Sequence, residues 1–199
     1  MSAKSYEALR KKSRGKFSMV KFAQLKTLAK NTVGRSDAFL LKQMEITIDI
    51  ENQLDAKIDE IESQILECIR ALNPPILTIP GIGELTAAII LSEYGNINKF
   101  ENPAQLLSFA GLEPGYYQSG LAEHQGHMVK HGSSHLRYAL MNACLPLITY
   151  EPVFAEYYAK KRAEGKPHRV ALTHVAKKLL RVIFTLQTKN ISYDPTLIR

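Results

Sequence analysis

The run of residues 37–72, which contains neither glycine nor proline, constrains the fold of this chain more than any other feature. Its apolar side chains recur at alternating steps of four and three residues, at Leu54, Ile58, Ile61, Ile65, Cys68 and Leu72. Such a heptad repeat predicts one long α-helix with a single apolar stripe. Two interpretations remain open: the stripe packs on the chain's own domain, or it forms the seam of a coiled-coil dimer. The flanking acidic residues leave little second apolar face and favour the dimer.

The ends of this helix are marked by residues that cap or break helices. Ser36 or Asp37 is expected to cap its start, and Asn73-Pro74-Pro75 is expected to end it. We therefore divide the 199 residues into four segments. These are a basic linker and helix (1–36), the coiled-coil helix (37–73), a compact domain (74–190) and a tail (191–199).

Charge follows the same division. Residues 1–35 carry ten basic side chains and one acidic one, whereas residues 36–72 carry three basic and nine acidic ones. The whole chain has a formal net charge of +7, which favours a polyanionic partner such as DNA. The two cysteines, Cys68 and Cys144, favour a reducing, cytoplasmic location. No run approaches the length of an apolar membrane span, so no membrane partner is expected.

Short helices are expected in the compact domain at residues 85–94, 103–110, 134–149, 153–164 and 167–188, without convincing strands. The segment around Pro80, Gly81, Ile82 and Gly83 follows a short apolar stretch and precedes an apolar helix, a pattern that resembles the helix-hairpin-helix DNA-binding motif. Two glycines that tolerate positive φ would bring the backbone close to a phosphate at a helix N-terminus. The expected fold class is therefore mainly α: a long coiled-coil-like helix, then a compact helical domain containing a helix-hairpin-helix.

Residues 111–120 are predicted to form a loop in which Ser119 precedes Gly120. A serine becomes a nucleophile only when a base or a charged setting activates it, and Lys130 and Arg137 would supply positive charge to a phosphodiester transition state. A Ser-Gly pair alone is usually just a turn. Ser133 or Ser134 is expected to cap the helix that follows.

Two further groups of polar residues have alternative explanations. His124, His127, His131 and His135 have helical spacing, but Gly126 and Gly132 interrupt any helix joining them, so phosphate contact or solvation is favoured and no metal site is assigned. The helix at 167–188 combines a basic face with an apolar one. That basic face is either merely solvated or turned toward DNA.

Several short motifs follow the long helix in a fixed order. They are Pro80-Gly81-Ile82-Gly83, Asn96-Ile97-Asn98-Lys99-Phe100, Gly111-Leu112-x-Pro114, Gln118-Ser119-Gly120 and Lys130-x-Gly132-x-x-x-Leu136-Arg137. This ordered set resembles the C-terminal Transposase-20 domain of the Piv/MooV-like insertion-sequence transposases, of the DEDD type, some of which are guided by a bridge RNA. The resemblance covers residues 37–150.

The resemblance implies that the serine of the Ser-Gly motif, here Ser119, attacks the DNA backbone and forms a phosphoserine link, with Ser133 and Ser134 as weaker candidates. It also implies DNA as a partner, a guide RNA in some members, and a homo-oligomer through residues 37–72. Together with the hairpin, it assigns DNA binding to Pro80, Gly81, Ile82, Gly83, Gly120, Lys130, Gly132 and Arg137.

The resemblance also implies an N-terminal RuvC-like domain whose acidic quartet binds divalent metal. These 199 residues contain no counterpart of that quartet, so no cofactor is assigned to this chain, and it is expected to be inactive alone. Two alternatives remain: a non-catalytic helix-hairpin-helix module that binds DNA, and a helical interaction protein whose charge is incidental.

Overall fold

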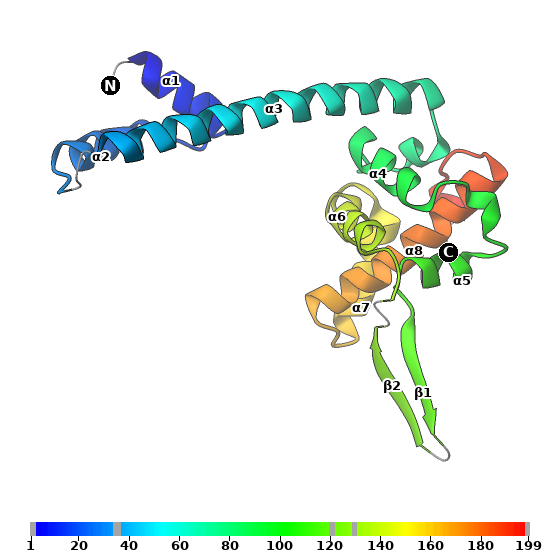
Figure 1. The fold of residues 1–199 in the computed structure, drawn as a ribbon. Coiled ribbons are helices and arrows are strands. Elements are labelled where there is room, and N and C mark those ends of the chain that lie inside the picture. Colours follow the sequence, from blue (N-terminus) through cyan, green and yellow to red (C-terminus); the bar gives the residue numbers. More distant parts are fainter. Residues whose placement is uncertain (1–2, 34–36, 120–121, 129–130, 198–199) are drawn as a thin grey trace. The chain divides into compact units, whose positions relative to one another are not determined.

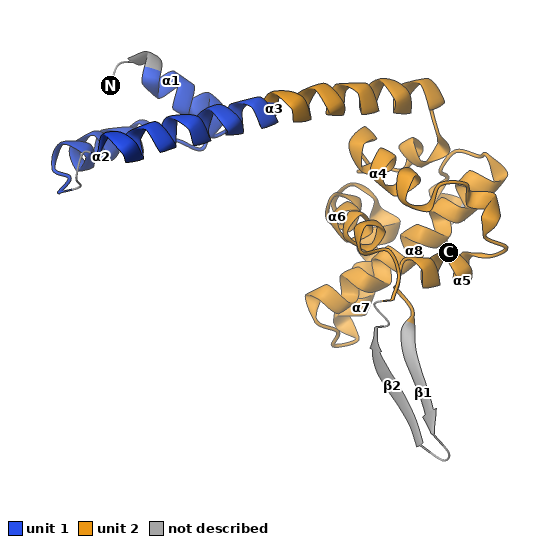
Figure 2. Cartoon of the chain, in the orientation of Figure 1, with its two compact units in different colours: residues 1–55 blue, residues 56–199 orange. Residues whose placement is uncertain are grey.

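The computed structural model describes residues 3–33, 37–119, 122–128 and 131–197 (Figure 1). The chain divides into two compact units, residues 1–55 and 56–199 (Figure 2). The first unit contains helices α1 (Ala3–Lys12) and α2 (Met19–Lys30) and the first half of α3 (Ala38–Leu72). The second contains the rest of α3 and all later elements.

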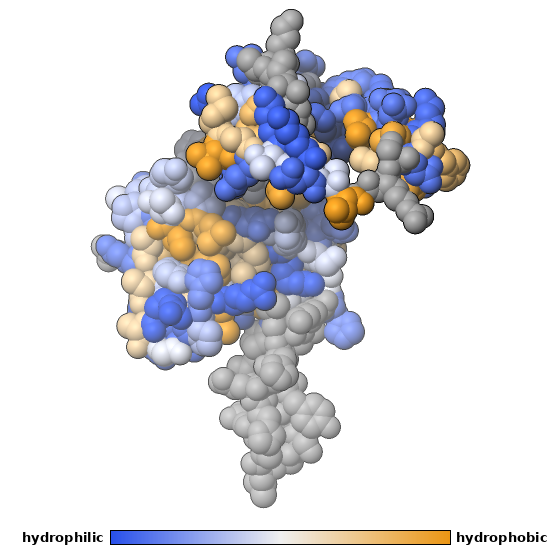
Figure 3. Space-filling model, turned by 90° about the vertical axis from the view of Figure 1, so that its left-hand side faces the viewer, coloured by the Kyte–Doolittle hydropathy of each residue, from blue (hydrophilic) through white to orange (hydrophobic). Residues whose placement is uncertain are grey.

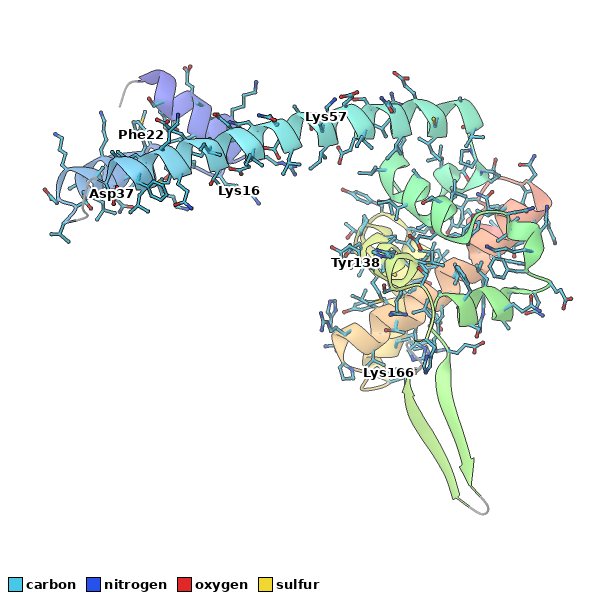
Figure 4. All side chains as sticks on the ribbon, viewed as in Figure 1. Lys16, Phe22, Asp37, Lys57, Tyr138 and Lys166 are labelled. Carbon is cyan, nitrogen blue, oxygen red and sulfur yellow. The ribbon has the colours of Figure 1, made fainter. Side chains whose placement is uncertain are left out.

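In the first unit, α2 confirms the basic helix expected before the long one, whereas α1, a short and strongly basic helix with few large apolar residues, was not predicted. Ser18 caps α2 by accepting a hydrogen bond from the Lys21 amide. The Phe22 ring is buried and lies 5.4 Å from that of Tyr6, centroid to centroid, which fixes α1 against α2. Asp37 stands at the start of α3 (Figure 4) and accepts from the Phe39 amide, which confirms the predicted cap.

The long helix α3 spans 35 residues, in agreement with the glycine- and proline-free run. Much of its apolar stripe remains exposed: Leu54, Ile58 and Ile61 are each more than half exposed, and Ile69 is the buried residue of the helix. Apolar side chains accordingly remain at the surface between hydrophilic ones in Figure 3. Leu54, Ile58 and Ile61 are therefore largely uncovered by the residues that the structure describes.

The second unit is organised around α8 (His168–Lys189), which contacts α5 (Pro103–Phe109), α6 (Ser134–Tyr150) and α7 (Pro152–Ala163). One face of α8 is apolar, and its residues at spacings of three and four are fully buried, among them Val175, Leu179 and Ile183. The 3-10 helices η1 (Pro75–Thr78) and η2 (Ile97–Lys99) and the helix α4 (Glu84–Tyr94) complete the core, and η3 (Pro195–Leu197) ends the described chain. The predicted fold class, mainly α, is confirmed.

The prediction of a loop without strands between α5 and α6 was wrong. Strands β1 (Pro114–Ser119) and β2 (Ala122–Met128) pair antiparallel, with Tyr117 opposite His124 and Ser119 opposite Ala122 (Figure 1). The register shifts between Pro114 and Tyr116. Neither strand has an alternating apolar face, so the sequence carried no period-two signal. Cross-strand backbone bonds form this hairpin without such a pattern.

No helix in the described ranges combines the length and the apolar character needed to cross a membrane.

Candidate nucleic-acid interface

The predicted phosphate-binding turn connects η1 to α4. Pro75 occupies the first position of η1, where its missing N–H costs no hydrogen bond. The Thr78 hydroxyl donates to the Pro75 carbonyl and accepts from the Tyr193 amide, which fixes the end of η1. The side chain of Ile82, one of the predicted DNA-binding residues, is buried, and its amide donates to the Ile79 carbonyl. One side of the turn is thus firmly packed.

Gly81 lies on the packed side of the turn. Its φ is +86°, a conformation that other residues rarely adopt. A Cβ atom built at this position would lie 2.9 Å from the carbonyl carbon of Pro146 in α6, closer than carbon atoms approach. Pro146 lies inside α6 and interrupts its hydrogen-bond ladder. Gly81 therefore serves the contact between the turn and α6.

Gly83 has the opposite environment. Its φ is −79° and its ψ 160°, so the prediction of a positive φ at this residue was wrong. It is exposed, and a Cβ atom placed on it would meet no atom within 4 Å. Gly83 is the N-cap residue of α4 and provides no side-chain cap. No residue that the structure describes accepts a hydrogen bond from the backbone amides of residues 83–86, so the start of α4 presents unpaired N–H donors.

Glu84, whose charge would oppose an anion at these amides, is paired with a cation. Arg70, in the last turn of α3, donates from Nε and Nη2 to the two carboxylate oxygens at 2.8 and 2.7 Å. The hydrogen bonds from Arg70 lower the pKa of Glu84, and those same bonds raise the pKa of Arg70. The pair neutralises the carboxylate at the start of α4, and sequence analysis did not identify Arg70.

Gly132 and Arg137 join the N-terminal end of α6 to the end of α5. A Cβ atom on Gly132 would overlap the Phe109 carbonyl and lie 2.6 Å from the Gly111 amide nitrogen. Arg137 is half-buried, and its Nη1 donates to the Ala110 carbonyl at 3.0 Å. Both residues therefore make intramolecular contacts next to the β1–β2 hairpin.

Ser133 also has a structural role. Its hydroxyl accepts from the Leu136 amide, which confirms it as the N-cap of α6, and donates to the Glu93 carboxylate at 2.6 Å. This bond links α6 to the C-terminal half of α4. The Ser133 hydroxyl both donates and accepts a hydrogen bond within the protein, so it is poorly suited to be a nucleophile. Ser134, the other candidate in this segment, is exposed.

The predicted nucleophile, Ser119, is the last residue of β1, and its side chain lies outside the described part of the structure. Gly120 and Lys130 also lie outside the described residues. The turn at Gly81 packs against Pro146, which lies nine positions after Arg137 in α6. That step corresponds to about 13 Å along the helix axis. The turn at residues 80–83 therefore packs near the C-terminal end of α6, whereas Gly132 and Arg137 lie at its N-terminal end. These two groups of predicted site residues do not form a single cluster.

Among the side chains that the structure describes, no three His, Cys, Asp or Glu residues lie close enough together to hold a metal ion. His131 and His135 are exposed, and the side chains of His124 and His127 lie outside the described set.

Residues 73–159 match the model of the transposase IS116/IS110/IS902 family. The chain is 32% identical to the insertion element IS110 uncharacterized 43.6 kDa protein of Streptomyces coelicolor, over 67% of this chain and 34% of that protein. It is 30% identical to the pilin gene-inverting protein of Moraxella bovis, over 73% and 46%. It is 28% identical to the transposase for insertion sequence element IS1111A of Coxiella burnetii, over 77% and 41%. The chain thus matches between a third and a half of the length of these relatives.

Proposed function

We propose that this chain, whose residues 73–159 match the model of the transposase IS116/IS110/IS902 family, is a DNA-binding part of an insertion-sequence transposase or site-specific recombinase. The family resemblance expected from the ordered motifs is confirmed. DNA binding by the turn at residues 80–83 and strand transfer by Ser119 are the specific parts of the proposal.

The start of α4 is the observation that carries the proposal. Its unpaired amides are bordered by Gly83, which has no side chain to block an approaching phosphate. A helix N-terminus with free N–H groups attracts anions through those groups and through the helix dipole. Arg70 compensates the one carboxylate in the first turn. Such contacts position a duplex without reading its sequence.

Gly83→Val tests this assignment because valine can adopt the backbone conformation of Gly83 and its side chain would occupy the open space in front of the amides. We expect affinity for a short DNA duplex to fall about 10- to 100-fold, the value of one or two hydrogen bonds to a charged group. Ala104→Val, an exposed substitution on α5, is the matched control and should bind as wild type.

Both variants are first compared with wild type by circular dichroism to establish that they fold. If folded Gly83→Val binds the duplex with unchanged affinity and an unchanged salt dependence, the turn at residues 80–83 is not the DNA site.

Ser119 is proposed as the nucleophile of strand transfer. Its Oγ would form a bond to a DNA phosphorus while the bond from that phosphorus to the neighbouring deoxyribose oxygen breaks. The hydroxyl proton passes to a base, and the departing oxygen takes up a proton, so the product is a phosphoserine ester. A matching acidic domain has to be supplied for this test, because this chain is expected to be inactive alone.

With that domain present, a covalent protein–DNA adduct should form with wild type and with Ser134→Ala, and should disappear in Ser119→Ala. An adduct that persists in Ser119→Ala would assign the chemistry to another residue. The comparison with Ser134 is matched because both serines were candidates and Ser134 is exposed.

A second copy of the chain is the proposed partner of α3. The stripe residues Ile61, Ile65, Cys68 and Leu72 line an apolar groove of about 810 Å³ together with Ile89 and Leu91 of α4. Exposed apolar residues at heptad spacing pack best against an equivalent helix. The proposal therefore includes a homo-oligomer built on residues 37–72, in the cytoplasm, with a guide RNA as a further candidate ligand.

A further inference from the structure

A second concave surface with a different chemistry lies between α7 and α8. It is a groove of about 530 Å³, and its polar lining includes Lys160, Lys178, Arg181, Thr185, Ser192 and Asp194. Tyr157, Val182 and Leu186 provide its apolar part. The groove shares no residue with the turn at 80–83.

The cations of this groove are not held in short ion pairs with any described residue. Among the described residues, no carboxylate lies within ion-pairing distance of Lys160, Lys178 or Arg181, whereas Lys161 pairs with Glu164 at 2.8 Å. The one acid in the lining, Asp194, accepts hydrogen bonds from the amide and hydroxyl of Thr196. The net charge of the lining is therefore positive.

Aromatic rings hold one of these cations in position. Lys178 Nζ lies 4.9 Å from the ring centroid of Tyr157 and 5.6 Å from that of Phe154. Contacts with two ring faces orient the ammonium group without neutralising it. A preoriented cation loses less side-chain freedom when it binds an anion.

The fold partly removes the Lys178 side chain from water. Burial lowers the pKa of Lys178, and the Glu156 carboxylate partly opposes that effect. Lys177, the next residue of α8, does not line the groove, and its pKa is lowered by burial and then by repulsion from Arg181. A bound anion would favour the charged form of Lys178, which burial disfavours.

The shape of the groove favours a chain of phosphates over a single one. Lys178, Arg181 and Thr185 lie at spacings of three and four on one face of α8. At 1.5 Å per residue this row is about 10 Å long, which matches about three nucleotides of a strand at a rise of 3.4 Å. Apolar residues between the polar ones suit the sugars. We infer that the α7–α8 groove binds the sugar–phosphate backbone of a nucleic acid, at a site separate from the helix-hairpin-helix turn.

The test uses the full chain with Lys160, Lys178 and Arg181 all replaced by Gln. A variant with Lys57, Lys99 and Lys189 replaced by Gln has the same net charge and is the control, since these lysines are exposed and lie outside the groove. Affinity is measured over a series of salt concentrations for a labelled DNA duplex and for an RNA strand with the same number of phosphates.

The groove variant should bind at least one of the two probes with a shallower salt dependence, the log–log slope falling by about 2–3 for three lost phosphate contacts. The probe that is affected identifies DNA or RNA as the source of the backbone. Arg181→Glu, an exposed single substitution, should also weaken binding of that probe, which excludes loss of the Lys178 ring contacts as the cause.

Unchanged slopes on both probes, or an equal change in the control variant, would overturn the inference. The outcome is independent of the hairpin proposal. Gly83→Val would still weaken DNA binding if the groove played no part, and the groove variant would still lose slope if the hairpin played none.

Discussion

The two glycines of the hairpin turn lead to opposite expectations, and Gly81→Ala gives the sharper one. An alanine at a φ of +86° is strained by about 1–2 kcal/mol. Its Cβ would also lie 2.9–3.1 Å from three backbone atoms of Pro146 and Leu147. Backbone atoms of a packed helix cannot rotate away, and overpacking of this kind costs about 1–3 kcal/mol. The free energy of unfolding should therefore fall by about 2–5 kcal/mol in total.

Gly83→Ala provides the internal control for that value. The φ of −79° suits alanine, and the new methyl meets no neighbouring atom. The loss of a favourable N-cap residue and the reduced freedom of the unfolded chain oppose each other, so the net change should stay within about 1 kcal/mol.

Thermal unfolding of both variants, followed by circular dichroism, measures the difference. For a chain of this size, Gly81→Ala should lower Tm by about 4–20 °C, and Gly83→Ala by no more than about 4 °C. Equal midpoints for the two variants would refute the claim that the turn is packed at Gly81 and open at Gly83. The same comparison explains why Gly83, and not Gly81, is the position at which to test DNA binding.

Three further outcomes follow from the structure. The double substitution Ile58→Asp with Ile65→Asp should dissociate the proposed dimer of α3. The control pair, Ala56→Asp with Ser63→Asp, lies on the opposite face of the helix and should leave the dimer intact. An unaltered sedimentation mass for the first pair would contradict the dimer. Arg70→Gln should weaken DNA binding because it leaves the Glu84 carboxylate unpaired beside the α4 amides. Adding Glu84→Gln to this variant should restore the affinity. Wild-type affinity in Arg70→Gln alone would refute a role for the ion pair. Burial raises the pKa of the Cys144 thiol to about 12, so in the native protein at neutral pH iodoacetamide should leave Cys144 unmodified, and a mass spectrum that shows a modified Cys144 would contradict the buried site.

Much of the helical framework could be predicted because local signals fix it. The run without glycine or proline gave α3 within one residue, and Asp37 and Ser133 cap helices as their residue types indicate. The β-hairpin could not be predicted, because its strands pair through backbone hydrogen bonds and have no alternating pattern. Local sequence therefore predicted the helices that are marked by caps, breaks and apolar spacing, and failed for strands that have no alternating pattern.

The candidate site could be predicted by motif but not by the role of each residue. Gly81 and Gly83 belong to one short motif, yet one packs against α6 and the other faces open space. Arg137 carries the charge expected of a DNA contact, but its guanidinium donates to the Ala110 carbonyl. Arg70 and Glu84 lie 14 residues apart and meet only because α3 ends beside α4. These distinctions depend on tertiary contacts, which no residue spacing encodes.

The hairpin, the groove and α3 together determine how binding should depend on salt and on assembly. In the proposed mode of binding, one turn at residues 80–83 would contact about one or two phosphates through amides, and such neutral donors release few counterions, whereas the three groove cations would contribute about 2–3 to the log–log slope. Most of the salt dependence should therefore come from α7–α8, and much of the salt-resistant affinity from the start of α4. In a dimer the second copy binds DNA intramolecularly, so the Ile58 and Ile65 substitutions should lower affinity although neither residue touches DNA. If these substitutions act only by dissociating the dimer, the affinity should fall while the log–log salt slope per protomer stays unchanged. Damage to the turn at residues 80–83 or to the α7–α8 groove would not show this combination.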